Sequence, residues 1–501
     1  MVLESLSDRI RGHALCTPGR LAIADDGVEL SYSALDLLLD RVAAALQRDG
    51  VDPGRVVASV AEPNVAQTLV FLGALRAGCV AAPLQPSATA AQIASMLADA
   101  DANMTFLDAP ATAALAGERL PGRIVALAEL EQWLTAADAR PKPVAVSPED
   151  GFNIIYSSGT TGTPKGIVQS HAMRASQFAS YAPIGFGEAV TLIATPLYSN
   201  TTLVSLLPTL FYGGGVVLMR RFNARRYLEL AERYRATHTM LVPVQYSRIM
   251  ALPEFERFDL SAFRFKTSTS APFAATLKAD VIARWPGRLI EFYGMTEGGG
   301  STVLDATAHP DKLATVGKPA PGHDIRLVGE DERELPVGEI GEVVSRSDAM
   351  MRGYHGRQVA TEDAIWIDPK GAPFIRHGDI GRFDRDGFLT LLDRKKDMII
   401  SGGFNIYPSD LEAVLSRHPD VVECAVVGMP SAQWGETPVG FYVAAAGTST
   451  DPVSILADTN ELLGKTQRLA ALHALAELPR SAIGKVLKRE LRETLAAEAQ
   501  V

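Results

Sequence analysis

The chain has 501 residues and a formal net charge of −10, so we expect two or more domains and no nucleic-acid-binding surface. Its three cysteines, Cys16, Cys79 and Cys424, lie far apart in the sequence, which argues against zinc and is typical of a reducing cytosol. The N-terminal stretch MVLESLSDRIRGHALC carries scattered charges, and no apolar run approaches ~20 residues. We therefore expect a cytoplasmic protein with no signal peptide and no transmembrane segment.

The first part of the chain alternates short apolar runs with helical patterns. In chain order, these are the helical 33–50, the strand-like 55–61, the helical 65–78, the strand-like 79–84, the helical 91–100 and the strand-like 103–108. The same alternation recurs between Ala189 and Tyr293. This rhythm predicts an α/β fold in which mostly parallel sheets are flanked by helices.

The pattern of apolar and turn residues changes after Gly322. Strand-like runs broken by Gly, Pro and acidic turns predict a small antiparallel β subdomain. A helix is then expected from Ser409, two strands at 421–430 and 438–447, and a charged helix at the end of the chain. We place a large N-terminal domain at residues 1–393, a hinge at 394–396 and a small, mobile α+β C-terminal domain at 397–501.

The stretch YSSGTTGTPKG, Tyr156–Gly166, follows a strand-like run, and ligands of open α/β sheets bind at strand ends. Its glycines let backbone N–H groups turn toward an anion, its hydroxyls add donors, and Lys165 supplies a compact positive charge. The spacing of Gly162 and Lys165 does not match a Walker A loop. The stretch therefore predicts a different polyphosphate-binding loop; the alternative is a glycine-rich connection whose hydroxyls face water.

This loop resembles the signature of the AMP-forming acyl-CoA synthetases, and four further stretches match that family in its order. They are EFYGMTEGG at Glu291–Gly299, RHGDIGRFDRDGFLTLLDRKKDMIISGG at Arg376–Gly403, NIYPSDLEAVL at Asn405–Leu415 and LPRSAIGKVLKREL at Leu478–Leu491. The resemblance implies a reaction in two steps. A carboxylate attacks the α-phosphate of ATP, assisted by Mg²⁺, and the thiol of coenzyme A then displaces AMP from the acyl adenylate.

The resemblance also implies which residues bind the nucleotide. The β- and γ-phosphates would be held by the loop residues Ser157, Ser158, Gly159, Thr160, Thr161, Gly162 and Lys165. The adenine side of the site would be formed by Tyr293, Gly294, Ser270, Ala271 and Pro272.

The residues expected to act on the α-phosphate and ribose follow from the same motifs. Thr296 would contact the α-phosphate, and Glu297 would bind Mg²⁺, which prefers hard oxygen ligands. Asp379 would accept hydrogen bonds from both ribose hydroxyls, and Arg394 would reach the ribose or phosphate. Lys485 would bridge the carboxylate and the α-phosphate during adenylation. Taken singly, Thr296 is also consistent with a helix cap and Asp379 with a turn residue. A solvated lysine at the start of a basic helix describes Lys488 and Arg489, whereas Lys485, directly after Gly484 in the motif, favours catalysis.

In this family the C-terminal domain rotates between the two half-reactions, and Lys396 matches the hinge. Rotation would withdraw Lys485 and bring Gly402 and Gly403 to the site, where Gly403 would line the pantetheine tunnel.

The chain departs from the family pattern at three positions. Ser199 stands in the place of a histidine between acyl pocket and thiol tunnel, Thr269 replaces a glycine, and His377 replaces a threonine. The residues expected near the acyl group are Tyr198, Ser199, Asn200, Gln245, Thr269 and Met295. Several of them, Tyr198, Asn200, Gln245 and Met295, fit a purely packing role as well.

Three hypotheses follow, from two classes of protein. The first is an ATP-dependent carboxylic acid–CoA ligase for a monocarboxylic acid, which could be small, medium, branched or aromatic. Monocarboxylates are ranked above dicarboxylates although Arg248 matches an arginine of malonate-type ligases. The second is an adenylating enzyme that loads a carrier protein, and the third a nucleotide sensor without catalysis. A homodimer is left open.

Overall fold

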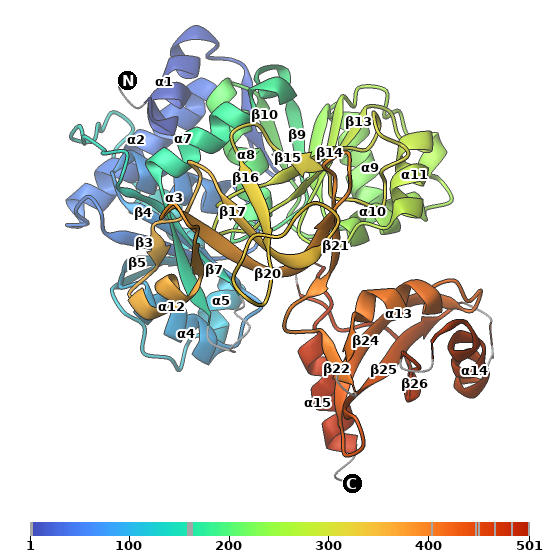
Figure 1. The fold of residues 1–501 in the computed structure, drawn as a ribbon. Helices are drawn as coiled ribbons and strands as arrows, with labels where there is room; N and C mark the ends of the chain where they lie inside the picture. Colours follow the sequence, from blue (N-terminus) through green and yellow to red (C-terminus); the bar gives the residue numbers. More distant parts are fainter. Residues whose placement is uncertain are drawn as a thin grey trace. The chain divides into compact units, whose positions relative to one another are not determined.

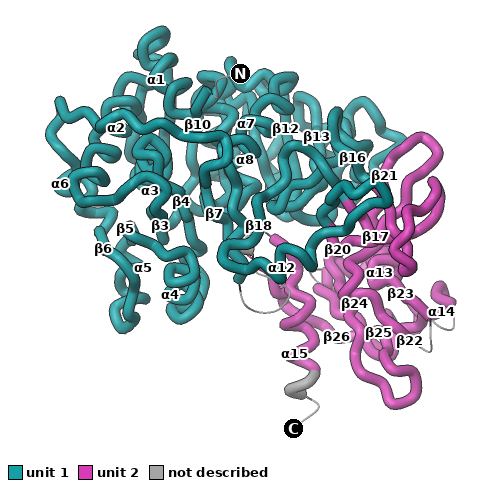
Figure 2. Tube along the Cα trace, turned by 60° about the vertical axis from the view of Figure 1, so that its left-hand side comes forward, with its two compact units in different colours: residues 1–325, 345–375 teal, residues 326–344, 376–501 magenta. Residues whose placement is uncertain are grey.

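The computed structural model describes residues 4–157, 164–401, 404–445, 448, 451–464, 467–481 and 484–498. The chain divides into two compact units, coloured separately in Figure 2. The first contains residues 1–325 and 345–375, and the second contains residues 326–344 and 376–501. Each unit is therefore built from two separate stretches of chain, and the hinge at 394–396 stays a prediction.

The first unit contains a nine-stranded sheet in the order β15-β14-β13-β12-β11-β9-β10-β1-β2 (Figure 1). Its strands are β1 Leu21–Ala24, β2 Glu29–Ser31, β9 Val190–Ile193, β10 Gly215–Leu218, β11 His238–Leu241, β12 Phe265–Ser268, β13 Arg288–Tyr293, β14 Thr302–Asp305 and β15 Lys318–Pro319. The central pairs from β1 to β13 are parallel, whereas β2, β14 and β15 run antiparallel to their neighbours.

A seven-stranded sheet in the order β18-β8-β7-β4-β3-β5-β6 completes the strand framework around the predicted phosphate loop. Its strands are β3 Val56–Val60, β4 Val80–Leu84, β5 Ala102–Leu107, β6 Arg123–Ala126, β7 Gly151–Ser157, β8 Lys165–Ser170 and β18 Gly353–Tyr354. The strands β3 to β7 are parallel, and β8 and β18 are added antiparallel. The β7–β8 hairpin thus flanks the phosphate loop on both sides.

Helices connect these strands, as the alternation of patterns predicted. They are α1 Leu6–Cys16, α2 Tyr32–Arg48, α3 Val65–Arg76, α4 Ala90–Asp99, α5 Ala109–Ala114, α6 Leu130–Trp133, α7 His171–Ser180, α8 Asn200–Tyr212, α9 Ala224–Arg233, α10 Pro243–Met250, α11 Ala275–Arg284 and α12 Gln358–Asp363, with 3₁₀ turns at Leu127–Glu129, Ala182–Ile184, Phe186–Glu188 and Phe255–Arg257. Helix α3 is buried along almost its whole length, which explains its continuous apolar sequence.

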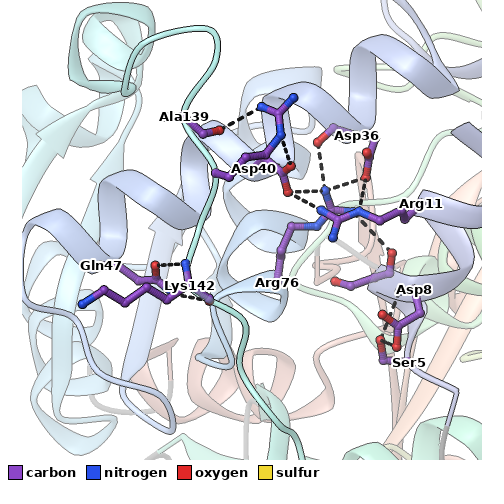
Figure 3. Close-up of polar contacts among 11 residues, drawn as sticks. Ser5, Asp8, Arg11, Asp36, Asp40, Gln47, Arg76, Ala139 and Lys142 are labelled. Carbon is purple, nitrogen blue, oxygen red and sulfur yellow. Dashed lines mark hydrogen bonds and ion pairs between the residues drawn. The ribbon is translucent and has the colours of Figure 1, made fainter.

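A buried ion cluster joins the first three helices (Figure 3). The Arg76 guanidinium at the end of α3 lies 2.6 Å from the Asp36 carboxylate and 2.9 Å from that of Asp40, both on α2. Arg11 of α1 also pairs with Asp40. Removing one partner of such a buried pair leaves an uncompensated charge, so the cluster fixes how these helices pack.

The chain crosses between the units within three strands, β16 Asp324–Val328, β17 Ile340–Arg346 and β20 Pro373–Phe383. In the first unit, the start of β20 pairs with β19 Ile365–Ile367. In the second unit, the end of β20 pairs with β21 Leu389–Arg394. Both pairings are antiparallel, as expected for this part of the sequence.

The remainder of the second unit is an α+β domain, in agreement with the sequence. Its sheet has the order β23-β22-β25-β24 with β26 beside β25. The strands are β22 Ile399–Ser401, β23 Phe404–Ile406, β24 Val421–Ser431, β25 Gly435–Ala444 and β26 Ala471–Leu475, and the helices are α13 Pro408–Leu415, α14 Pro452–Leu462 and α15 Lys488–Glu498. Side chains alternate along β24: Val426 packs with α13 and α14, while Ala425 and Val427 pack with α15, so both faces of the sheet are covered (Figure 1).

In the part of the chain that the structure describes, every helix is too short or too polar to cross a lipid bilayer.

Candidate active site

The β7–β8 hairpin positions the lysine of the predicted phosphate loop. Ser157 at the end of β7 lies opposite Lys165 at the start of β8 in the antiparallel register. The intervening loop residues assigned to phosphate binding lie outside the described residues, as do the two glycines assigned to the thiol tunnel; these are Ser158, Gly159, Thr160, Thr161, Gly162, Gly402 and Gly403.

Glu297 lies in the first unit together with Lys165. Its side chain is nearly buried, with 9% of the residue exposed. The Tyr354 hydroxyl donates a hydrogen bond of 2.9 Å to its Oε1, and the Lys165 ammonium lies 4.9 Å from the centre of the Tyr354 ring. Burial and the Glu297 carboxylate raise the pKa of Tyr354, so its hydroxyl stays a donor at neutral pH. The arrangement keeps a cation and a carboxylate close to the same aromatic side chain.

Backbone contacts define the turn that presents Thr296 and Glu297. The Gly298 N–H donates to the Met295 carbonyl at 3.0 Å, and the Met351 N–H donates to the Glu297 carbonyl at 2.8 Å. Gly298 has φ of +78°, and a Cβ there would lie 1.7 Å from the Ala349 carbonyl oxygen. Only glycine fits this position, which accounts for the first glycine after Glu297.

A buried polar network supports the same turn from beneath. Arg174 donates hydrogen bonds to the Asn153 side-chain oxygen at 2.9 and 3.0 Å, and Asn153 donates to that of Gln169 at 2.9 Å. The Gln169 amide in turn donates to the Thr296 carbonyl at 2.8 Å. Because Arg174, Asn153 and Gln169 are all fully buried, this chain of hydrogen bonds holds the Thr296 backbone rigidly.

The segment after β12 carries backbone strain beside the predicted acyl pocket. Ser270 has φ of +81°, although it is not a glycine, and such a conformation costs of order 1–3 kcal/mol. Its hydroxyl lies 2.6 Å from that of Thr201 in α8. Ser199 caps the same helix by accepting from the Thr201 N–H. These contacts bring the two predicted pocket segments, 198–200 and 269–272, side by side.

The remaining predicted pocket residues vary in exposure. Tyr198 and Asn200 are half-buried, and burial raises the pKa of Tyr198. The Asn200 Oδ1 atom is shielded from solvent without a hydrogen-bond partner in the described part of the chain. Gln245 instead makes a structural contact, since its amide donates to the Ala194 carbonyl at 2.8 Å. Met295 packs against the apolar cluster around Ile167.

The adenine-side residues also lie in the first unit. Tyr293, at the end of β13, is half-buried, as are Thr269 and Ala271, whereas Gly294 and Pro272 are exposed. Strands β12 and β13 are parallel neighbours, so both segments leave the sheet at the same edge. This edge is where ligands of α/β sheets bind.

Within the second unit, the antiparallel register places Asp379 of β20 directly opposite Arg394 of β21. The Arg394 Nε lies 2.6 Å from the Asp379 Oδ1. Asp379 is buried, while 44% of the Arg394 side chain is exposed. The two residues assigned to the ribose therefore form an ion pair with each other. His377, two residues earlier, is buried, and burial lowers its pKa to about 4.

Lys485 is exposed at the end of a tight turn in the second unit. The Ser481 N–H donates to the Lys485 carbonyl at 2.8 Å, and the Lys485 N–H donates to the Ser481 hydroxyl at 3.2 Å. Three residues later, Lys488 is committed to an ion pair with Glu412 at 2.9 Å. Lys396 is exposed in the turn after β21. Lys485 and Lys396, the two lysines of the second unit with predicted roles, are thus exposed, while Lys488 is structural.

The residues present fit a magnesium ion held with phosphates. Groups of three or more potential ligands among His, Cys, Asp and Glu are absent from the described residues, but a phosphate-shared Mg²⁺ needs only one or two protein carboxylates. Glu297 provides a nearly buried carboxylate whose partner among the described side chains is a hydroxyl rather than a cation. A buried carboxylate that has no cationic side chain as its partner favours a bound cation.

Fold and site together define a class of protein, the enzymes that activate a carboxylic acid by adenylation. The chain is similar in structure to ATP-bound MatB from Rhodopseudomonas palustris, with a TM-score of 0.88, 30% identity and 98% of each chain covered. In sequence it is 33% identical over 489 residues to a feruloyl-CoA synthase from Amycolatopsis sp, covering 96% of each chain. It is 31% identical over 508 residues to the fatty acid–[acyl-carrier-protein] ligase ScoC from Streptomyces coeruleorubidus, covering 98% of this chain and 96% of that one.

Residues 10–355 match the family described as AMP-binding enzyme, and residues 410–485 match the AMP-binding enzyme C-terminal domain. The chain therefore belongs to the AMP-binding enzyme family. It is an AMP-forming acyl-CoA synthetase, an acid–thiol ligase that uses ATP and coenzyme A. The resemblance, the fold class and the ligase activity predicted from the sequence are confirmed.

Sequence reasoning missed the residues that support the site. Asn153 and Gln169 were detectable as polar residues within otherwise apolar strand runs, a pattern that indicates buried hydrogen-bonding groups. Tyr354 gave no such signal, because a tyrosine after a glycine is ordinary in a loop. Only its position against Lys165 and Glu297 reveals it.

Proposed function

We propose that this synthetase acts on an aromatic monocarboxylic acid, with a hydroxycinnamate such as ferulate as the first substrate to test. The similarity to a feruloyl-CoA synthase over nearly the whole chain supports this choice. The hydroxyls of Thr201 and Ser270 beside the predicted pocket add polar groups that suit a substituted ring better than an alkyl chain. The proposal keeps monocarboxylates above dicarboxylates.

The observation that carries the catalytic part is the grouping of Lys165, Tyr354 and Glu297 in the first unit. Two anions must meet during adenylation, and fixed donors and cations offset their repulsion. In this proposal Lys165 binds the terminal phosphates, and Thr296 donates its hydroxyl to the α-phosphate. Glu297 would hold Mg²⁺, whose charge neutralises phosphate oxygens when the ion is bound.

We assign the remaining roles to residues of the second unit. Asp379 and Arg394, already paired, form a preorganised surface for the ribose diol. Lys485 is exposed, and its backbone is hydrogen-bonded to Ser481; we assign its ammonium to the carboxylate and the α-phosphate. We assign the exchange between the two half-reactions to rotation about Lys396.

A second candidate is transfer of the acyl group to a carrier protein, favoured by the similarity to ScoC. The test is pyrophosphate release with ferulate, benzoate, octanoate and malonate, each with and without coenzyme A. Ferulate-dependent release together with feruloyl-CoA supports the proposal. Release with acyl-AMP but no thioester supports the carrier-protein candidate, and turnover with octanoate alone contradicts the aromatic assignment.

A further inference from the structure

The segment Gly353–Arg357 is fastened to the strand that carries Lys165. Tyr354 lies opposite Ile167 in the antiparallel β18–β8 pair, and the His355 N–H donates to the Gly166 carbonyl at 2.7 Å. The Tyr354 N–H donates to the Thr361 hydroxyl at 3.0 Å. These backbone hydrogen bonds hold Tyr354 next to the strand that carries Lys165.

The Tyr354 side chain contacts both charged groups of the site in different ways. Its hydroxyl donates to the Glu297 Oε1 at 2.9 Å, and its ring lies 4.9 Å from the Lys165 ammonium. Between Lys165 and Glu297, both described residues, there is no ion pair, although their charges are opposite. A direct pair would neutralise the two groups that a metal-bound nucleotide needs, and binding would have to break it.

We propose that Tyr354 is a positioning residue of the nucleotide site: its hydroxyl orients the Glu297 carboxylate for the metal, and its ring holds Lys165 apart from that carboxylate. This inference rests on the proposed function, in which Glu297 binds Mg²⁺. A hydrogen bond to a charged group fixes its rotamer, and a cation over an aromatic face is stabilised without being neutralised.

The other side of the hairpin is attached to the same segment through a different carboxylate. Arg357 donates to the Asp99 Oδ1 at 3.0 Å, and the Tyr156 hydroxyl donates to the Asp99 Oδ2 at 2.8 Å. Tyr156 thus resembles Tyr354 in donating a hydrogen bond to a carboxylate. Its partner Asp99, however, is paired with Arg357 and is not assigned to bind a metal or substrate. Tyr156→Phe is therefore a matched control for the loss of a tyrosine hydroxyl near the loop.

The experiment measures Mn²⁺ affinity by electron paramagnetic resonance with saturating ATP and no acid substrate, so that no turnover occurs. We expect Tyr354→Phe to weaken Mn²⁺ binding about tenfold, the scale of a hydrogen bond to a charged group. ATP affinity in EDTA should change less than about twofold, because the ring and Lys165 are retained. Tyr156→Phe should leave Mn²⁺ affinity unchanged. Equal Mn²⁺ affinity for Tyr354→Phe and the unaltered enzyme overturns the inference, as does an equal loss in Tyr156→Phe.

A double-variant comparison separates this inference from the proposed function. Glu297→Gln should weaken Mn²⁺ binding more than Tyr354→Phe, and adding Tyr354→Phe to Glu297→Gln should cause no further loss, since the tyrosine acts through the carboxylate. If Glu297→Gln leaves Mn²⁺ affinity intact, the metal assignment itself fails. If only Glu297→Gln has an effect, the assignment stands and the role of Tyr354 fails.

The ring has its own test. Tyr354→Leu removes both hydroxyl and ring, so ATP affinity in EDTA should fall about threefold beyond the value for Tyr354→Phe, the scale of an exposed cation–π contact. A thermal unfolding transition like that of the unaltered enzyme shows that the variant is folded. Equal metal-free ATP affinity for the Leu and Phe variants contradicts the role of the ring. If the Leu variant does not fold, Tyr354→Trp is measured in its place. Because tryptophan keeps an aromatic ring, its metal-free ATP affinity should be retained, and a loss would contradict the role of the ring.

Discussion

At the scale of single residues, Ser270 shows how a functional segment tolerates strain. A non-glycine residue at φ of +81° is unfavourable. The contact between the Ser270 and Thr201 hydroxyls, 2.6 Å apart, offsets part of that strain. The sequence drew attention to Thr269 as a departure, whereas the strain falls one residue later, because backbone angles cannot be inferred from residue identity alone.

Lys485 tests the assignment of roles between the half-reactions. Lys485→Ala should slow adenylation about 10²–10³-fold, on the scale of losing one fixed charge-stabilising donor. Thioester formation from supplied acyl-AMP should be nearly unaffected, because the α-phosphate has already been attacked. Single-turnover measurement of each half-reaction checks this expectation. Equal loss in both steps would show that Lys485 supports the site generally and does not act in adenylation.

A buried histidine should make the enzyme sensitive to acid. His171 is 7% exposed, and burial, opposed by the charge of Asp150, lowers its pKa to about 4. Because the unfolded chain binds a proton below about pH 6.5 and the folded protein does not, stability falls as pH decreases from 6.5 toward 4. At pH 5 this contribution is roughly 2 kcal/mol. His171→Gln should reduce the stability difference between pH 7.5 and 5 by that amount in urea unfolding.

A pH profile for His171→Gln that parallels that of the unaltered enzyme would assign acid sensitivity to other groups.

At the scale of elements, helices and strands with a regular apolar pattern could be predicted, and their pairing could not. The patterns at 33–50 and 65–78 became α2 and α3 within two residues at each end. Helix α1 escaped notice because only Leu6 and Ile10 of its side chains are buried, so its stability depends on the ion cluster with α2. Likewise, β1 pairs with β10 although nearly 200 residues separate them in the chain. Such contacts arise from the folded structure and leave no local signature.

At two helix ends, exchanging glycine and a larger residue should change the free energy of unfolding in opposite directions. Arg235 follows α9 with φ of +48°, and the Arg235 and Ala236 N–H groups make both hydrogen bonds of a Schellman motif. Arg235→Gly should raise the free energy of unfolding by about 1 kcal/mol, because glycine adopts this conformation without strain. Its exposed ion pair with Asp259 contributes little.

Gly213 closes α8 with φ of +92°, and a Cβ there would lie 2.7 Å from the His13 ring. Gly213→Ala should therefore lower the free energy of unfolding by more than about 1 kcal/mol. Chemical denaturation of both variants measures these two changes in the free energy of unfolding. Destabilisation by Arg235→Gly would mean that its side chain contributes more than its backbone strain costs.

At the scale of the whole molecule, the predicted hinge can be tested by restricting one dihedral angle. The backbone N–H of Lys396 makes no hydrogen bond to another described residue, while those of Lys395 and Asp397 do. Lys396→Pro therefore removes no described hydrogen bond but fixes φ near −65°. If rotation about this residue separates the half-reactions, one of them should slow at least about tenfold while the other persists. Unchanged single-turnover rates in both half-reactions would place the hinge elsewhere.

Residues 326–344 belong to the second unit although residues 345–375, which follow them, belong to the first. An engineer who exchanges only the C-terminal region from Lys396 onward between relatives would therefore transplant part of a folding unit and leave its complement behind. Chimeras should keep better expression and cooperativity when the donor supplies 326–344 and 376–501 together. Conversely, one proteolytic cut after residue 375 should not liberate an intact second unit, because a piece of it stays covalently joined upstream.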